Sequence, residues 1–135
     1  MADIKIFNPE GLNKSRSTFL QMARVKTSEL VFIAGQVSVD ATGALIGKND
    51  FNAQCAQVYA NIHIALHSVG ADWKNVVEFT SYLVRAQDVQ PFRDYRQQTF
   101  PNMFANGAYP PNTLLVISRL ADEGYLLEIK AIAAL

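Results

Sequence analysis

A glutamate in the last strand-like segment is the strongest candidate for chemistry. Glu128 lies between apolar residues in a segment, residues 126–135, in which both alternating sets of side chains include large apolar groups. A carboxyl group in a strand covered on both faces must be paired, partly hydrated or held neutral. We therefore interpret Glu128 as a candidate catalytic acid or base. Lys130, two residues away on the same face, offers a purely structural ion pair as the alternative.

Two histidines and one cysteine are weaker candidates. His63 and His67 have the i, i+4 spacing of a zinc-binding pair, but the glutamate that follows the first histidine in zincins is absent. We therefore expect no metal site, and we interpret both as residues on the flank of a helix. Cys55 falls on the apolar side of the same helix, where cysteine is more often a small hydrophobic residue than a nucleophile. No Gly-x-Ser-x-Gly motif and no phosphate-binding glycine loop is present.

The charge balance removes two classes of partner. Lys and Arg number 12, Asp and Glu also number 12, and half of the residues are apolar. A neutral chain lacks the positive surplus that drives binding to nucleic acid or to anionic membranes, so neither partner is expected. The single cysteine, the absence of a signal-like start and the lack of a 20-residue apolar run predict a cytoplasmic protein. Low net charge also favours self-assembly.

The segments that must position these residues form one domain, residues 1–135. Apolar periodicity predicts a helix over 50–69, capped by Asp50 and ended by Gly70, and a shorter helix from Asp88 to about Phe100. β-branched and aromatic runs predict strands over 29–40, 76–84, 113–120 and 126–135. A strand over 18–25 is expected to pair with 29–40, and the last two strands are expected to form a hairpin through 121–124.

This order, ββαβαββ, predicts an α+β fold with two helices on one face of a mixed sheet. The other face of the sheet then has no cover. Because 126–135 looks apolar on both sides, we expect a subunit interface there, although a folded-over tail of the chain would also serve. Gly35 inside a strand is unfavourable unless a bulge, another backbone or a ligand needs the space.

Several segments together resemble one family. The set is Phe32–Val37, Asn61–Ile62, Val69–Ala71, Val76–Thr80, Arg119–Asp122 and Leu127–Ala133. In their order and spacing they are similar to the RidA/YjgF family of reactive-intermediate deaminases, which is also labelled L-PSP endoribonuclease. The resemblance implies a chorismate-mutase-like α+β fold and a homotrimer with a barrel-like core. It also implies ligand clefts between subunits and hydrolysis of imines and enamines derived from amino acids, without a cofactor.

The resemblance also assigns site residues. Gly35 matches the glycine whose backbone lines the cleft, and Glu128 matches the acid that positions the attacking water. Phe19 falls where many members have a tyrosine. The arginine that grips the substrate carboxylate is replaced, because Pro110-Pro111 leads here to Asn112.

That replacement bears directly on the substrate. An asparagine amide keeps a hydrogen-bond donor but loses the fixed charge and the two parallel donors of a guanidinium. We therefore expect a different ligand, or a cation supplied by Arg96 or Arg24.

Three functions remain open at this stage. The first is a small-molecule hydrolase that acts on a C=N bond with altered substrate choice. The second is a trimeric metabolite-binding or interaction module without turnover. The third, an endoribonuclease, rests on a family label and is opposed by the neutral charge.

Overall fold

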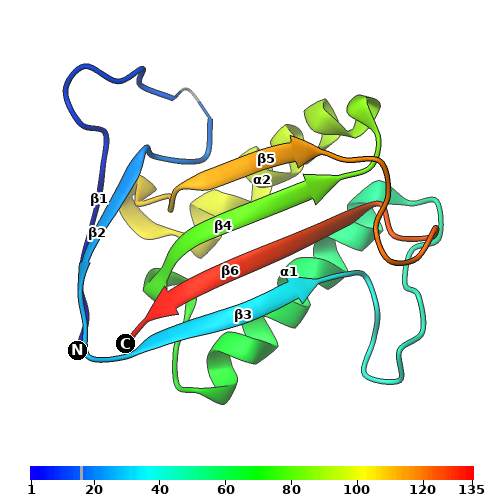
Figure 1. Ribbon diagram of the computed structural model, residues 1–135, viewed down its shortest axis with the longest axis horizontal. Helices are drawn as coiled ribbons and strands as arrows, with labels where there is room; N and C mark the ends of the chain where they lie inside the picture. Colours follow the sequence, from blue (N-terminus) through cyan, green and yellow to red (C-terminus); the bar gives the residue numbers. More distant parts are fainter. Residues whose placement is uncertain (16) are drawn as a thin grey trace.

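The computed structural model describes residues 1–15 and 17–135, and it has the predicted α+β architecture. The strands are β1 (Asp3–Phe7), β2 (Met22–Lys26), β3 (Leu30–Gln36), β4 (Val76–Leu83), β5 (Asn112–Val116) and β6 (Leu127–Ala134). The helices are α1 (Phe51–Ser68) and α2 (Val89–Met103), with short 3₁₀ turns at Trp73–Asn75, Ala86–Asp88 and Ala105–Gly107. Both helices lie on one face of the sheet, which confirms the predicted layer arrangement (Figure 1).

The main sheet has the order β3-β6-β4-β5. β6 pairs antiparallel with both β3 and β4, whereas β5 runs parallel to β4, so the sheet is mixed as expected. The predicted hairpin of the last two strands is wrong, because β4 lies beside both β5 and β6 and separates them. A parallel neighbour requires a crossover connection rather than a tight turn. That crossover is made by α2 and the loop after it.

The pairing predicted for the first strands is also wrong. β2 forms a separate two-stranded sheet with β1, a strand that was not predicted. In Figure 1 this pair stands at the end of the main sheet where β3 begins and β6 finishes. The turn at residues 27–29 leads directly into β3, and the Leu135 N–H donates to the Glu29 carbonyl (3.1 Å). This turn therefore joins two sheets instead of two neighbouring strands.

The helix α1 follows its sequence pattern closely. The Asp50 side chain accepts a hydrogen bond from the Ala53 N–H (3.0 Å), as an N-cap should, and Gly70 adopts φ +75° just after the helix. The apolar stripe packs on β3 and β6, and its fully buried members are Cys55, Val58, Ile62 and Leu66. Between the helices and the sheet, the Tyr59, Phe79, Phe92, Phe100 and Phe104 rings fill the core.

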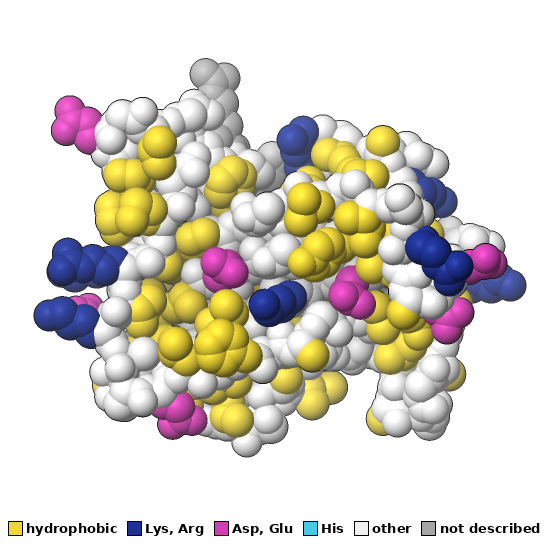
Figure 2. All heavy atoms as spheres, in the orientation of Figure 1, with side chains coloured by type: hydrophobic (Ala, Val, Ile, Leu, Met, Phe, Trp, Pro, Cys, Tyr) yellow, Lys and Arg dark blue, Asp and Glu magenta, His cyan; other side chains and the backbone are white. Residues whose placement is uncertain are grey.

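The face of the sheet that the helices leave uncovered is partly apolar. Strand alternation places Leu30 and Phe32 of β3 there, with Ile132 of β6 directly opposite Phe32. Phe32 is 66% exposed. Figure 2 shows this face, on which hydrophobic side chains gather in patches over the sheet, separated by single charged groups. On this face of β6, Glu128 and Ile132 are partly exposed and Lys130 is exposed, so the described residues do not supply the cover that was expected for the last strand.

Candidate functional site

Gly35 and Glu128 lie against each other at an irregularity of the sheet. The β3–β6 register shifts between Ile33 and Gln36, which is a β-bulge, and Glu128 lies on the adjacent stretch of β6. A Cβ atom placed on Gly35 would lie 2.5 Å from Glu128 Oε2 and 2.8 Å from its Cγ. Only glycine therefore leaves room for the carboxylate in this position.

The Glu128 side chain is half-buried on the uncovered face of the sheet. Its cross-strand neighbour on β4 is Tyr82, a residue to which the sequence analysis gave no role. Within residues 1–15 and 17–135 the Glu128 carboxylate has no ion pair, so Lys130 is not its partner, and no hydrogen bond holds it. A half-hydrated carboxylate without a structural partner is free to bind a ligand or a water molecule.

Asn112 lies at a different place in the same chain. It is the first residue of β5 and pairs with Phe79, whereas Glu128 pairs with Tyr82. The two residues are thus separated by about 10 Å along the strands and about 10 Å across them. The Asn112 Oδ1 atom accepts a hydrogen bond from the Ser81 hydroxyl (2.7 Å). The Ser81 side chain lies on the face of β4 that the helices cover. Within one chain, Asn112 does not meet Glu128.

The segment that carries Phe19 is bonded to the loop that leads to Asn112. Phe19 lies in the irregular segment before β2, where the next residue, Leu20, donates its N–H to the Tyr109 carbonyl (3.1 Å). Tyr109 begins the run that leads through two prolines into Asn112. The chain therefore places Gly35 beside Glu128, and it places the segment that carries Phe19 beside the loop that leads to Asn112.

Arg96 anchors the segment that carries Phe19 and does not face a cleft. Its guanidinium is buried between the rings of Phe92 and Phe100, 5.3 and 4.5 Å from their centroids, and its Nη2 donates to the Thr18 carbonyl (2.7 Å). Burial lowers the pKa of Arg96. The Nε atom has no partner among the described residues. In this position Arg96 is not available as the replacement cation. Arg24 lies exposed on β2, beside a small hollow lined also by Asp3, Lys5 and Lys26.

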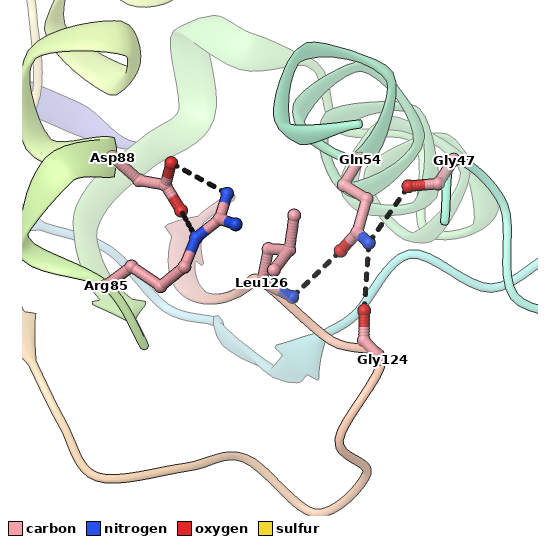
Figure 3. A network of polar contacts seen from close by, with 6 residues as sticks. All are labelled: Gly47, Gln54, Arg85, Asp88, Gly124 and Leu126. Carbon is pink, nitrogen blue, oxygen red and sulfur yellow. Dashed lines mark hydrogen bonds and ion pairs between the residues drawn. The ribbon is translucent and has the colours of Figure 1, made fainter. Parts of the chain in front are cut away.

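A buried glutamine on α1 fixes the loop that leads to Glu128 (Figure 3). The Gln54 side chain donates to the Gly47 carbonyl (3.1 Å) and the Gly124 carbonyl (2.9 Å), and it accepts from the Leu126 N–H (2.9 Å). These three bonds tie two loops and the start of β6 to one helix. Gln54 was not among the predicted site residues, although a polar residue on the buried side of an apolar helix stripe is a signal of such a role.

An ion pair nearby holds the connection between β4 and α2. The Arg85 guanidinium donates to both carboxylate oxygens of Asp88, at 2.7 and 2.9 Å (Figure 3). The Asp88 carboxylate is buried, and this hydrogen-bonded contact raises the pKa of Arg85. The pair is structural, because both partners satisfy each other.

Comparison with known proteins identifies the family. A family model described as Endoribonuclease L-PSP matches residues 14–135. The chain belongs to the Endoribonuclease L-PSP family. Among curated relatives, a RutC family protein of Pyrococcus horikoshii is 30% identical over 109 residues, which cover 81% of this chain and 82% of the relative. The RutC family protein YjgH of Escherichia coli is 27% identical over 93% of this chain and 90% of its own.

Solved structures share the fold of this L-PSP family chain. The Rid family protein YyfB of Yersinia pestis superimposes with a TM-score of 0.85 at 27% identity, with 98% of each chain covered. TdcF of E. coli, solved with bound serine, has a TM-score of 0.69 at 23% identity, over 96% of this chain and 98% of its own. The resemblance to the RidA/YjgF family is thereby confirmed. No helix that the structure describes is long and apolar enough to cross a membrane.

Proposed function

We propose that this L-PSP family protein hydrolyses the C=N bond of a small imine or enamine metabolite, with Glu128 positioning the attacking water. The observation that carries the proposal is the glycine bulge, where Gly35 leaves space for a Glu128 carboxylate that has no structural partner among the described residues. Family membership supports a role of this class at the level of deaminase or metabolite binding.

The reaction needs only water and a base. An enamine first tautomerises to its imine, and the Glu128 carboxylate accepts a proton as the water oxygen adds to the imine carbon. Glu128 returns this proton to the nitrogen, which gives the carbinolamine. The hydroxyl proton then passes through the carboxylate to the nitrogen as the C–N bond breaks, and ammonia leaves. The products are one carbonyl compound and one ammonia for each water consumed. A positioned general base contributes about 10² to 10⁴ in rate.

We propose further that the complete cleft forms between subunits of a homotrimer. Asn112 and Glu128 lie apart in one chain, and the uncovered sheet face carries exposed apolar groups such as Phe32. A neighbouring subunit would bring its Asn112 and Phe19 to the Gly35 and Glu128 of this one. Large exposed apolar faces in a monomer are typical of such interfaces.

Asn112 shapes our expectation for the substrate. Its side-chain oxygen is engaged by Ser81, and the amide carries no charge with which to grip a carboxylate. We therefore expect the cleft to prefer an imine that is neutral near the reacting carbon. A metabolite-binding module without turnover is the second candidate, favoured by the same lack of a cation at this position.

The decisive experiment compares two imines. 2-Aminoacrylate, which is anionic, and its neutral amide are generated enzymatically, and ammonia release is followed with and without the protein. We expect faster release from the amide. Glu128→Gln should lower this rate about 10²-fold or more, whereas Asp94→Asn, which also turns a carboxylate into an amide but on the exposed side of α2, should not. Asn112→Arg should shift the preference to 2-aminoacrylate. If stoichiometric protein accelerates neither reaction but binds a small metabolite such as serine, the protein is a metabolite-binding module and the hydrolase proposal is wrong.

A further inference from the structure

Two histidines and an aspartate converge at the carboxyl end of α1. His63 and His67 lie one turn apart on the exposed side of the helix, and Asp72 follows in the loop after Gly70. The Nε2 atoms of the two histidines lie 3.2 and 3.7 Å from the same oxygen, Asp72 Oδ1. One ligand atom from each residue lies within 4.8 Å of the others. The sequence predicted no metal site here, because the glutamate of zincins is absent after His63; the third donor in the structure, Asp72, comes from outside the helix.

The cluster is held in place by its neighbours. The Asp72 Oδ1 atom accepts a hydrogen bond from the Trp73 N–H (2.8 Å), and Asn75 Oδ1 accepts from the Asp72 N–H (3.0 Å). The His63 ring stacks on the Trp73 indole, with centroids 5.1 Å apart and planes 7° from parallel. Partners of this kind orient metal ligands in known sites.

We propose that His63, His67 and Asp72 bind a divalent late first-row transition-metal ion, for which Zn²⁺ is the reference. Two imidazoles and one carboxylate are donors that such ions prefer, whereas Mg²⁺ and Ca²⁺ prefer oxygen ligands alone. Ligand atoms about 2.0–2.1 Å from a tetrahedral ion are separated by about 3.3 Å, close to both nitrogen–oxygen distances in the cluster. Three protein ligands leave the fourth position for water.

The alternative is a hydrogen bond that merely closes the end of the helix. One histidine would suffice for that purpose, and His63 already makes the contact at 3.2 Å. The second ring is also turned toward Asp72, with the two imidazole centroids only 4.0 Å apart. A cation between these donors accounts for the position of both rings.

This site is separate from the proposed cleft. The Asn75 side chain donates to the Ala134 carbonyl at the end of β6, whereas Glu128 lies near its beginning. Six residues of strand separate the two positions, a span of about 20 Å. The metal would therefore brace the junction of α1, the Trp73 loop and the end of the sheet, and its binding is testable without any activity assay.

The single tryptophan of the chain provides the readout. Protein without a histidine tag is first treated with a chelator and dialysed. Zn²⁺ binding is then measured by calorimetry, and Co²⁺ binding by the quenching of Trp73 fluorescence and by visible absorption. We expect one ion per chain, no response to Mg²⁺, and a Zn²⁺-dependent rise in the thermal midpoint. His63→Ala, His67→Ala and Asp72→Asn should each weaken Zn²⁺ binding at least about tenfold.

Asp122→Asn removes an exposed carboxylate elsewhere and serves as the matched control, which should bind like the unchanged protein. The His67 side chain is 57% exposed, so His67→Ala should fold normally, as its metal-free thermal midpoint will show. The proposal is overturned if the unchanged protein takes up no Zn²⁺ at millimolar concentration. It is equally overturned if both histidine variants keep the original stoichiometry and affinity.

Discussion

Gly35 determines where the Glu128 carboxylate can lie, because an added methyl group would overlap its Oε2 and Cγ atoms. We expect Gly35→Ala to push the Glu128 side chain aside by about 1 Å and to lower imine hydrolysis about 10²-fold. The free energy of unfolding should fall by only about 1–2 kcal/mol, since a flexible side chain can move. Ammonia release and urea denaturation measure the two effects.

Gly124→Ala is the matched control for this prediction. Its Cβ would lie 2.8 Å from the Leu45 Cδ2 atom, a similar overlap with a flexible but apolar side chain. We expect a similar loss of stability with the activity retained. Equal losses of activity in both variants would show that Gly35 acts through stability alone.

Cys55 offers a second test on the scale of a single residue. Its side chain has no exposed surface, and burial, followed by the nearby charge of Asp88, raises the pKa of its thiol. Since the thiolate is the reactive form, the folded protein should not react with a thiol reagent at about pH 8. One equivalent should react after denaturation in urea. Rapid modification of the folded protein would contradict the packing of α1.

On the scale of elements, Gln54 joins α1 to two loops, one that precedes α1 and one that precedes β6. Gln54→Leu keeps the size of the side chain but leaves the Leu126 N–H and two carbonyls without their partners. We expect the free energy of unfolding to fall by about 3 kcal/mol. Gln90→Leu on the exposed side of α2 should change it by less than about 0.5 kcal/mol. Urea denaturation of both variants gives the comparison, and equal values would exclude the anchoring role of Gln54.

The helices and strands were predictable where buried positions recur along the sequence at the spacing of a helix or a strand. The stripe from Cys55 to Leu66 identified α1, and Asp50 and Gly70 marked its ends because capping is local chemistry. β1 was missed although Asp3–Ile6 alternate polar and apolar residues, because the strand has only five residues and none is fully buried. The partners of Gln54 could not be predicted, since a polar side chain in a helix does not indicate which loops will reach it.

On the scale of the whole molecule, the uncovered sheet face is the feature to test. We expect Phe32→Glu to weaken the proposed trimer at least about 30-fold, because an exposed aromatic residue would be replaced by a charge at every interface. Ile64→Glu is the matched control, since Ile64 is equally exposed, at 68%, but lies on the helix layer. Sedimentation equilibrium distinguishes the variants. A chain that is monomeric before any substitution would contradict the trimer.

The site was predictable only in part, for a reason that also belongs to this scale. Gly35 in a strand and Glu128 among apolar residues are local anomalies, and the structure places them together. The order of the strands depends on crossovers that no local pattern encodes, so the separation of Asn112 from Glu128 could not be predicted. For Arg96, the sequence did not indicate that its guanidinium would be buried and would donate a hydrogen bond to the Thr18 carbonyl.

The central place of β6 has a consequence for how the chain acquires its structure. β6 follows β3, β4 and β5 in sequence, yet it is the strand that joins β3 to the others; Phe32 pairs with Ile132, one hundred residues later. During synthesis from the amino terminus, β3 therefore has no partner strand in the main sheet until β6 has been made, whereas α1 and α2 can already form. Such long-range closure is slow and leaves an apolar strand edge open to other chains. We therefore expect nascent chains of this protein to depend on chaperones until β6 has been made.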